Sequence, residues 1–306
     1  GDPMTATALH RGRQRGWAHD EGHPAGSFHT YDALDPGGGP PRKVHLLVPR
    51  SPGPWPLVIK HDGDKTFWPR GSTWDVASTL SQLEGAVRPP LVVAVHPRDR
   101  NQDYTHVDWA AGTRPWGGLG RYAAWLAGHL VPWVRANYPT EATPAGTAVV
   151  GSSHGGLASF WCATRHPEVF GAAGCLSPSF FSGLDDLATG ERSETPLRGS
   201  PLVAPVRGLL GDPLRRPRLW ICWGLRRDGG AHNAIVEALA TERGREMAAM
   251  LERECGYRSG VDLWGIEDPD AGHDEAADHG AQDEEVADNY GHVMQVRRGV
   301  GCARVG

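Results

Sequence analysis

The chain has 306 residues, of which 39% are hydrophobic, and its formal net charge is -5 at pH 7. This length fits one large α/β domain with a sizeable core. Because no block of one charge sign stands out, the composition excludes a nucleic-acid-binding surface, and no stretch approaches the roughly 20 apolar residues that a membrane span needs.

Short β-branched runs alternate with amphipathic stretches along the chain. The runs predict strands at residues 28–34, 44–48, 57–60, 91–95, 147–150, 219–223 and 261–266. Apolar residues at helical spacing predict helices at residues 74–87, 120–138, 157–164 and 234–255. This alternation predicts an α/β fold with a mostly parallel central sheet and helices on both faces. The first two strands are expected to form an antiparallel hairpin at one edge.

Two stretches lack this alternation. Residues 1–26 are polar and rich in His, Arg and Gly, which predicts a flexible leader ahead of a single domain over residues 27–306. Residues 177–217 are rich in Pro, Gly and charged side chains, with little periodicity. Because this stretch is too long for an ordinary connection, we interpret it as a lid-like insertion on the substrate side of the domain.

The most informative motif is G-x-S-x-G, which runs from Gly151 to Gly155 between a predicted strand and a predicted helix. A nucleophile on such a tight turn has a strained backbone, and the two glycines remove side chains that would collide with the strand or helix. The helix N-terminus favours negative charge beside the turn. The motif predicts Ser153 as the nucleophile and the backbone N–H of His154 as an oxyanion donor. Ser152 is the weaker candidate because its flanks do not form the motif.

Further motifs accompany this turn. They are Arg165-His166-Pro167-Glu168-Val169-Phe170-Gly171, Leu176-Ser177-Pro178-Ser179, His61-Asp62-Gly63 and Arg100-Asn101-Gln102-Asp103-Tyr104-Thr105. Together they resemble the esterase D / enterochelin esterase family of α/β-hydrolases over about residues 42–275. The resemblance implies the α/β-hydrolase fold and hydrolysis of carboxylic esters, although some members of the family transfer acyl groups instead.

The resemblance also implies an oxyanion hole formed by the backbone N–H groups of His154 and of Gly63 or Asp64. Two features depart from the family pattern. His154 stands where many members have a less polar residue, and a polar, Gly-rich tail follows the region of the terminal histidine motif. Since a fold does not fix a function, either departure is compatible with altered chemistry on the same scaffold.

A histidine base is expected after the last strand, because the order in this fold is serine, acid, histidine. His273 lies there in a Gly-His-Asp sequence that resembles the family's terminal histidine motif. A neutral imidazole at this place takes the serine proton and returns it to the leaving group. His279 is an alternative six residues later, and His292 is a weaker one.

The acidic partner of the base is expected after the strand at residues 219–223. Asp228 stands where the family has this residue, and its role would be to hold the imidazole tautomer and stabilise its charged form. The alternative is a solvated aspartate beside two arginines. Glu237 and Glu242 remain candidates, because the segment after Asp228 is longer than usual in the family.

Aromatic and basic residues are predicted on the side where the strands end. Trp68, Trp74, Trp109 and Trp116 would line a cleft for a bulky, planar or apolar substrate, or else pack the loops that carry them. Arg100 in the same region is a candidate to bind a carboxylate of the substrate, and a solvated arginine is the alternative.

The favoured function is a serine hydrolase that cleaves a carboxylic ester or thioester of a small molecule, such as a siderophore-like or secondary-metabolite ester. The alternatives are a biosynthetic tailoring enzyme that transfers acyl groups or forms bonds without hydrolysis, and a non-catalytic small-molecule binding protein. No spacing predicts a metal or a cofactor. The expected partner is a small-molecule substrate, with no nucleic acid or membrane, and a homodimer is left open. The five cysteines, an odd count without a secretory signal, predict free thiols in the cytoplasm.

Overall fold

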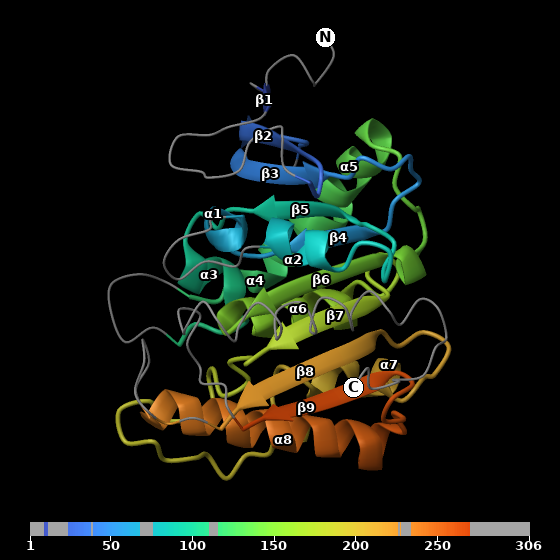
Figure 1. Ribbon diagram of the computed structural model, residues 1–306. Helices are drawn as coiled ribbons and strands as arrows, with labels where there is room; N and C mark the ends of the chain where they lie inside the picture. The colour runs from blue at the N-terminus through green and yellow to red at the C-terminus, as the bar shows by residue number, and fades with distance from the viewer. Residues whose placement is uncertain are drawn as a thin grey trace.

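The apolar runs of the sequence form the strands of one sheet. The computed structural model describes residues 9–11, 24–37, 39–67, 76–109, 116–225, 227 and 234–269 of the chain. Within these residues, nine strands lie in the order β1-β2-β3-β5-β4-β6-β7-β8-β9 (Figure 1). Their bounds are β1 Leu9–Arg11, β2 Ser27–Leu34, β3 Arg42–Val48, β4 Leu57–Lys60, β5 Leu91–Val95, β6 Thr147–Ser152, β7 Ala172–Leu176, β8 Arg218–Gly224 and β9 Leu263–Asp268.

The sheet is antiparallel at one edge and parallel in the remainder. β2 pairs antiparallel with β1 and β3, and β3 pairs antiparallel with β5. From β5 through β4, β6, β7 and β8 to β9, every pair is parallel. The arrangement confirms the predicted α/β-hydrolase fold and its antiparallel edge hairpin. Residues 9–11, which fall in the predicted leader, form the outermost strand, β1.

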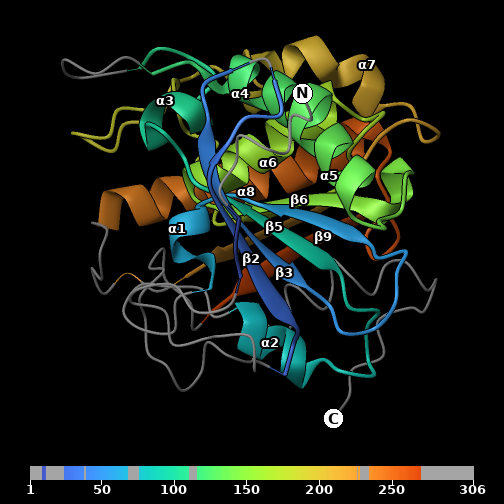
Figure 2. The same ribbon diagram turned by 90° about the horizontal axis from the view of Figure 1, so that it is seen from above.

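Helices lie on both sides of the sheet. Their bounds are α1 Gly63–Thr66, α2 Val76–Gln82, α3 Arg100–Tyr104, α4 Leu119–Trp125, α5 Val131–Asn137, α6 His154–Arg165, α7 Arg207–Leu210 and α8 Ala234–Cys255. In Figure 2, α2 lies on one side of the strands, and α4, α5, α6 and α8 lie on the other. None of the helices in the described ranges is long and apolar enough to cross a membrane.

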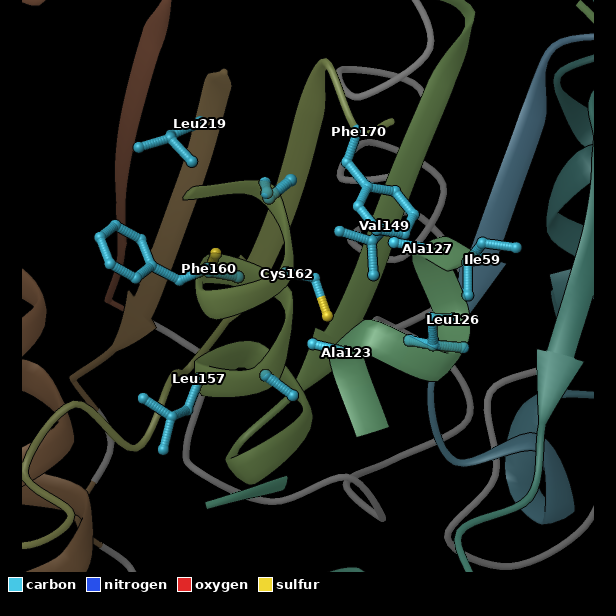
Figure 3. Close-up of a cluster of buried hydrophobic side chains, with 14 of the residues drawn as sticks. Ile59, Ala123, Leu126, Ala127, Val149, Leu157, Phe160, Cys162, Phe170 and Leu219 are labelled. Atoms are coloured by element: carbon cyan, nitrogen blue, oxygen red, sulfur yellow. The ribbon is translucent and has the colours of Figure 1, made fainter. Parts of the chain in front are cut away.

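Each face of the sheet has its own apolar core, because successive side chains of a strand point to opposite faces. Along β4, Leu57 and Ile59 belong to the cluster beneath α4 and α6, whereas Val58 belongs to the cluster on the α2 side. Figure 3 shows Ile59 and Val149 together with Leu126 in the first cluster. Every residue of β4, β5, β6 and β7 is buried, as expected for parallel strands covered on both faces.

Several elements differ from the sequence-based prediction. β7 was not predicted, because its sequence Ala-Ala-Gly-Cys-Leu contains no β-branched residue. The helix predicted at residues 74–87 ends earlier, since α2 stops at Gln82. The helix predicted at residues 120–138 is divided by a π-helical turn, Leu126–Leu130, between α4 and α5. Pro132 follows this turn. Because proline has no N–H, it cannot donate a hydrogen bond to the preceding turn of helix, and the helix changes pitch at this place.

The predicted insertion at residues 177–217 packs against α8. The buried carboxylate of Asp185 accepts hydrogen bonds from Nε and Nη2 of Arg243 at 2.8 and 2.6 Å. Arg243 Nη1 also donates to Glu246 at 2.6 Å. Later in the segment, Leu197, Leu202, Val203, Val206 and Leu210 are buried in the main core cluster. Much of this segment is therefore part of the packed domain, and its role as a lid stays a prediction.

Candidate active site

The carboxyl-terminal ends of the parallel strands bring the predicted site segments to one edge of the sheet. β4 leads into residues 61–64, β5 leads toward α3, and β6 leads to Ser153. β7 leads into residues 177–179 at the same edge. In Figure 1, α1 and α3 lie at the end of the sheet toward which the arrows of these strands point. Ligands of open α/β sheets bind at this edge, so the arrangement marks it as the candidate site.

The turn at Ser153 has the strained geometry that the motif predicts. Ser153 has φ 58° and ψ -117°, a region that residues with a side chain rarely adopt. A Cβ atom on Gly151 would lie 2.5 Å from the carbonyl oxygen of Gly155, and one on Gly156 would lie 3.1 Å from the carbonyl oxygen of Leu176. Only glycine fits at position 151 while β6 and α6 remain this close, and a side chain at position 156 would have to displace the end of β7 by a few tenths of an ångström.

The hydroxyl of Ser153 lies beside the chain that follows β7. The Ser153 N–H donates to the carbonyl oxygen of Leu176 at 2.8 Å, and the Ser179 N–H donates to the carbonyl oxygen of Ser153 at 3.1 Å. The side-chain oxygens of Ser153 and Ser179 lie 3.1 Å apart. Ser153 is 8% exposed and Ser179 is fully buried. Sequence reasoning did not single out Ser179, although the residue lies within one of the motifs that carry the family resemblance.

The loop after β4 lies beside the first turn of α6. A Cβ atom on Gly155 would lie 3.4 Å from both Asp62 Oδ2 and His61 Cβ. Gly63 is pressed against β5, where a Cβ atom would lie 2.6 Å from the carbonyl oxygen of Ala94. Among the described residues, the backbone N–H groups of Gly63 and Asp64 have no hydrogen-bond acceptor. An oxyanion hole that uses one of these two amides stays a prediction.

Asp62 and Arg100 form an ion pair beneath this loop. Arg100 Nε donates to Asp62 Oδ1 at 2.8 Å, and Arg100 Nη2 donates to Asp62 Oδ2 at 3.0 Å. Burial raises the pKa of Asp62, but the charge and hydrogen bonds of Arg100, with Lys60 and Lys65 nearby, outweigh it and lower the pKa. The carboxylate is therefore ionised at neutral pH. The predicted role of Arg100 in substrate binding stays a prediction, and its guanidinium already holds this protein carboxylate.

His61 is a buried neutral residue next to the same loop. Its Nδ1 lies 2.9 Å from the hydroxyl of Tyr122, and its ring contacts those of Tyr104 and Tyr122. Burial lowers the pKa of His61 to about 3, so the imidazole carries no charge at pH 7. The hydroxyl of Tyr104 accepts a hydrogen bond from the N–H of Asp62 at 2.8 Å. These aromatic residues support the loop from inside the domain.

Aromatic rings gather beside the nucleophile turn. Trp116 lies edge-on to His154 with ring centroids 5.6 Å apart, and to Trp109 with centroids 5.7 Å apart. Trp109 in turn contacts Phe181, at 6.3 Å between centroids. The structure therefore brings one of the four predicted tryptophans, Trp116, to the residue after Ser153, and a second, Trp109, against Trp116. Phe181 was missed by sequence reasoning, because it lies in the stretch without periodicity.

Several predicted site residues lie outside the described residues. They are Trp68, Trp74, Asp228, His273, His279 and His292. The two alternative acids are described: Glu237 is buried in the first turn of α8, and Glu242 forms a half-exposed ion pair with Arg192 at 3.3 Å. No group of three or more potential metal ligands occurs within the described part of the chain.

Sequence comparison relates this chain to known proteins. A family model described as Putative esterase matches residues 39–277. The iron(III) salmochelin esterase of Escherichia coli O6:H1 is 29% identical over 245 residues, which make up 77% of this chain and 54% of that protein. The chain spans little more than half the length of the curated relatives that it matches.

Solved structures share the fold at low sequence identity. The BES protein from Bacillus cereus has a TM-score of 0.63 and 13% identity, and the alignment covers 87% of this chain and 94% of that one. An enterobactin esterase from Shigella flexneri, solved in the presence of 2,3-di-hydroxy-N-benzoyl-glycine, has a TM-score of 0.54 and 17% identity. Its alignment covers 86% of this chain and 58% of that one. At such identities the likeness establishes the fold alone.

Proposed function

The chain belongs to the putative esterase family and is a hydrolase of the esterase type, and we propose that it cleaves a carboxylic ester or thioester of a small molecule through an acyl-enzyme. The observation that carries this proposal is the strained turn at Ser153, between a buried parallel strand and a helix N-terminus. The turn supports a nucleophilic role, because folding retains a strained non-glycine residue only where the surrounding structure over-determines it.

In the proposed mechanism, Ser153 Oγ attacks the carbonyl carbon of the ester while its proton passes to His273. The negative oxygen that forms is stabilised by the backbone N–H groups of His154 and of Gly63 or Asp64. The carbonyl re-forms, the bond to the leaving group breaks, and His273 gives its proton to the departing alcohol or thiol. Water then attacks the acyl-enzyme by the same steps and releases the acid. Asp228 holds the imidazole of His273 in this proposal.

The proposed substrate carries an aromatic or otherwise planar acyl group. A series of ring contacts begins at His154, the residue after Ser153, and runs through Trp116 and Trp109 to Phe181. Such rings bind planar partners by edge and face contacts. The similarity to a salmochelin esterase agrees with a siderophore-like or secondary-metabolite ester. Because the chain spans about half of that protein, the main support for this substrate class is the aromatic residues of this chain.

Two neighbouring serines provide a matched test of the proposal. We expect the purified protein to react with a fluorophosphonate probe and to hydrolyse p-nitrophenyl acetate. Ser153→Ala should abolish labelling and lower kcat at least 1,000-fold, since the nucleophile is lost. Ser152→Ala, one residue earlier, should keep both. Absence of labelling in the unmodified protein would favour a non-catalytic binding protein, and labelling that persists in Ser153→Ala would refute the assigned nucleophile.

A further inference from the structure

One guanidinium group connects the two backbone segments that meet at the candidate oxyanion hole. Arg100 holds both carboxylate oxygens of Asp62, the residue immediately before Gly63. Its Nη2 also donates to the carbonyl oxygen of Ser152 at 3.2 Å, and Ser152 immediately precedes the proposed nucleophile, Ser153. We infer that Arg100 is a positioning residue that sets the spacing between the oxyanion donors and the nucleophile. This inference rests on the proposed function.

The loop that carries the donors has little regular structure to hold it in place. Asp62 has φ 55° and ψ 54°, in the left-handed region, and the helix that follows it, α1, has four residues and no side-chain cap. Hydrogen bonds hold the loop instead: Asp62 pairs with Arg100, the N–H of Asp62 donates to the hydroxyl of Tyr104, and the N–H of His61 donates to the carbonyl oxygen of Val150. Loss of Arg100 therefore removes the one side-chain partner described above for the carboxylate of Asp62, next to the peptide that leads into Gly63.

Only arginine suits this connection, because its planar fork donates in parallel to a carboxylate and still reaches a third acceptor. The Asp62 side chain is 2% exposed, whereas that of Arg100 is 29% exposed. The partly exposed guanidinium of Arg100 thus neutralises the buried carboxylate of Asp62. A lysine at position 100 would keep the charge but could not span both carboxylate oxygens and the carbonyl oxygen of Ser152.

The test separates positioning from substrate binding with p-nitrophenyl acetate, a small neutral ester that offers no carboxylate to an arginine. We expect Arg100→Gln to lower kcat about 100-fold, the loss typical of a misplaced catalytic group, and to change KM less than about threefold. Arg100→Lys should keep the fold and still lose at least about tenfold in kcat. The matched control is Arg98→Gln, an exposed arginine two residues before Arg100, which should leave both constants unchanged.

A second readout follows the oxyanion hole directly. An alkyl boronic acid that adds to Ser153 places a negative oxygen in the hole, so its affinity should fall in Arg100→Lys and Asp62→Asn by about the same factor as kcat/KM. The affinity for the product acid should change less than about threefold. A general loss of structure would instead weaken the binding of the boronic acid and of the product acid alike. Thermal unfolding of each variant verifies that the domain remains folded.

The possible failures are distinguishable. If the unmodified protein shows no Ser153-dependent hydrolysis, the proposed function is wrong. If the unmodified protein is active and Arg100→Lys and Arg100→Gln keep their kcat on the neutral ester, the inference about Arg100 is wrong. A rise in KM confined to anionic esters, with kcat unchanged on p-nitrophenyl acetate, would also overturn it and would assign Arg100 to substrate binding.

Discussion

At the scale of single residues, the proposed reaction determines which of Ser153 and Ser179 donates the hydrogen bond between them. Ser179 is fully buried, and within the described part of the chain its side-chain oxygen has one partner, Ser153 Oγ at 3.1 Å. When Ser153 gives its proton to the base, its oxygen is left as an acceptor. Ser179 is then the donor, and its hydrogen bond fixes the direction of the Ser153 oxygen during attack.

Replacement of Ser179 by alanine should therefore impair catalysis without unfolding the domain. A neutral hydrogen bond contributes about 0.5–1.5 kcal/mol, so we expect Ser179→Ala to lower kcat about three- to tenfold with little change in KM. The matched control is Ser182→Ala, because Ser182 is buried in the same turn. Steady-state hydrolysis of p-nitrophenyl acetate gives both constants. Equal kcat values for the two variants would show that the bond to Ser179 has no catalytic role.

The two halves of the site differ in how far the sequence predicted them. The turn at Ser153 could be predicted because its glycines, nucleophile and helix start are consecutive. The pair of Asp62 and Arg100 joins residues 38 positions apart, and the contact of Ser153 with Ser179 joins residues 26 apart. Such contacts depend on how neighbouring strands align, which the local pattern does not specify. The sequence thus marked Arg100 as a site residue but not the carboxylate that it holds.

At the scale of elements, α8 anchors the long segment that follows β7. Arg243 and Asp185 have side chains that are 1% and 0% exposed, and the N–H of Ser193 also donates to Asp185 at 2.9 Å. The hydrogen bonds raise the pKa of Arg243, and burial only partly opposes this shift. The pair fixes residues 185–193 on the helix.

Removal of the arginine should destabilise the protein, because it leaves the Asp185 charge buried without its main partner. We expect Arg243→Met to lower the free energy of unfolding by about 3–5 kcal/mol. Arg192→Met, which removes the half-exposed pair with Glu242, should cost about 1 kcal/mol or less. Urea unfolding monitored by circular dichroism measures both changes. Similar losses in the two variants would contradict a structural role for the buried pair.

Most strands were predictable from sequence, and the reasons for the exceptions are local. β4, β5 and β6 are rich in apolar β-branched residues and β8 is an apolar run with two tryptophans, and the prediction located all four within two residues at either end. β7 has small residues because it lies between β6 and β8 in the middle of the parallel part of the sheet, packed against α6. The short helices α1, α3 and α7 are too brief for a helical period to show in the sequence.

At the scale of the whole molecule, stability should depend on buried neutral histidines. Burial lowers the pKa of His61 to about 3, and burial with the charge of Arg165 lowers that of His106 to about 4. On the antiparallel edge, His45 bonds to Thr30 and His96, and burial, together with His96 and Lys43 nearby, lowers the pKa of His45 to about 2. All three pKa values lie below the ordinary value of about 6.5.

The free energy of unfolding should fall as the pH drops from about 7 toward 4. Between the folded and unfolded pKa values, the unfolded chain binds protons that the folded protein excludes, so acid favours unfolding. Each such histidine contributes a slope of up to about 1.4 kcal/mol per pH unit, and the full contribution is present above about pH 6.5. Urea unfolding at pH 7.5, 6.5 and 5.5 measures the slope. His106→Phe should lower the slope by up to about 1.4 kcal/mol per pH unit, most of it at the acid end of this range. A free energy of unfolding that does not change with pH would contradict a role for the buried histidines.

If Ser153 is the nucleophile, its side chain carries the acyl group during turnover. Intact-mass measurement and peptide mapping can detect this group in protein quenched in acid during hydrolysis of a p-nitrophenyl ester of an aromatic acid. We expect one acyl group per chain, on the peptide that contains Ser153, formed in a burst with one equivalent of p-nitrophenol. An active protein with no acyl group on that peptide, or with the group on another residue, would contradict the role of Ser153.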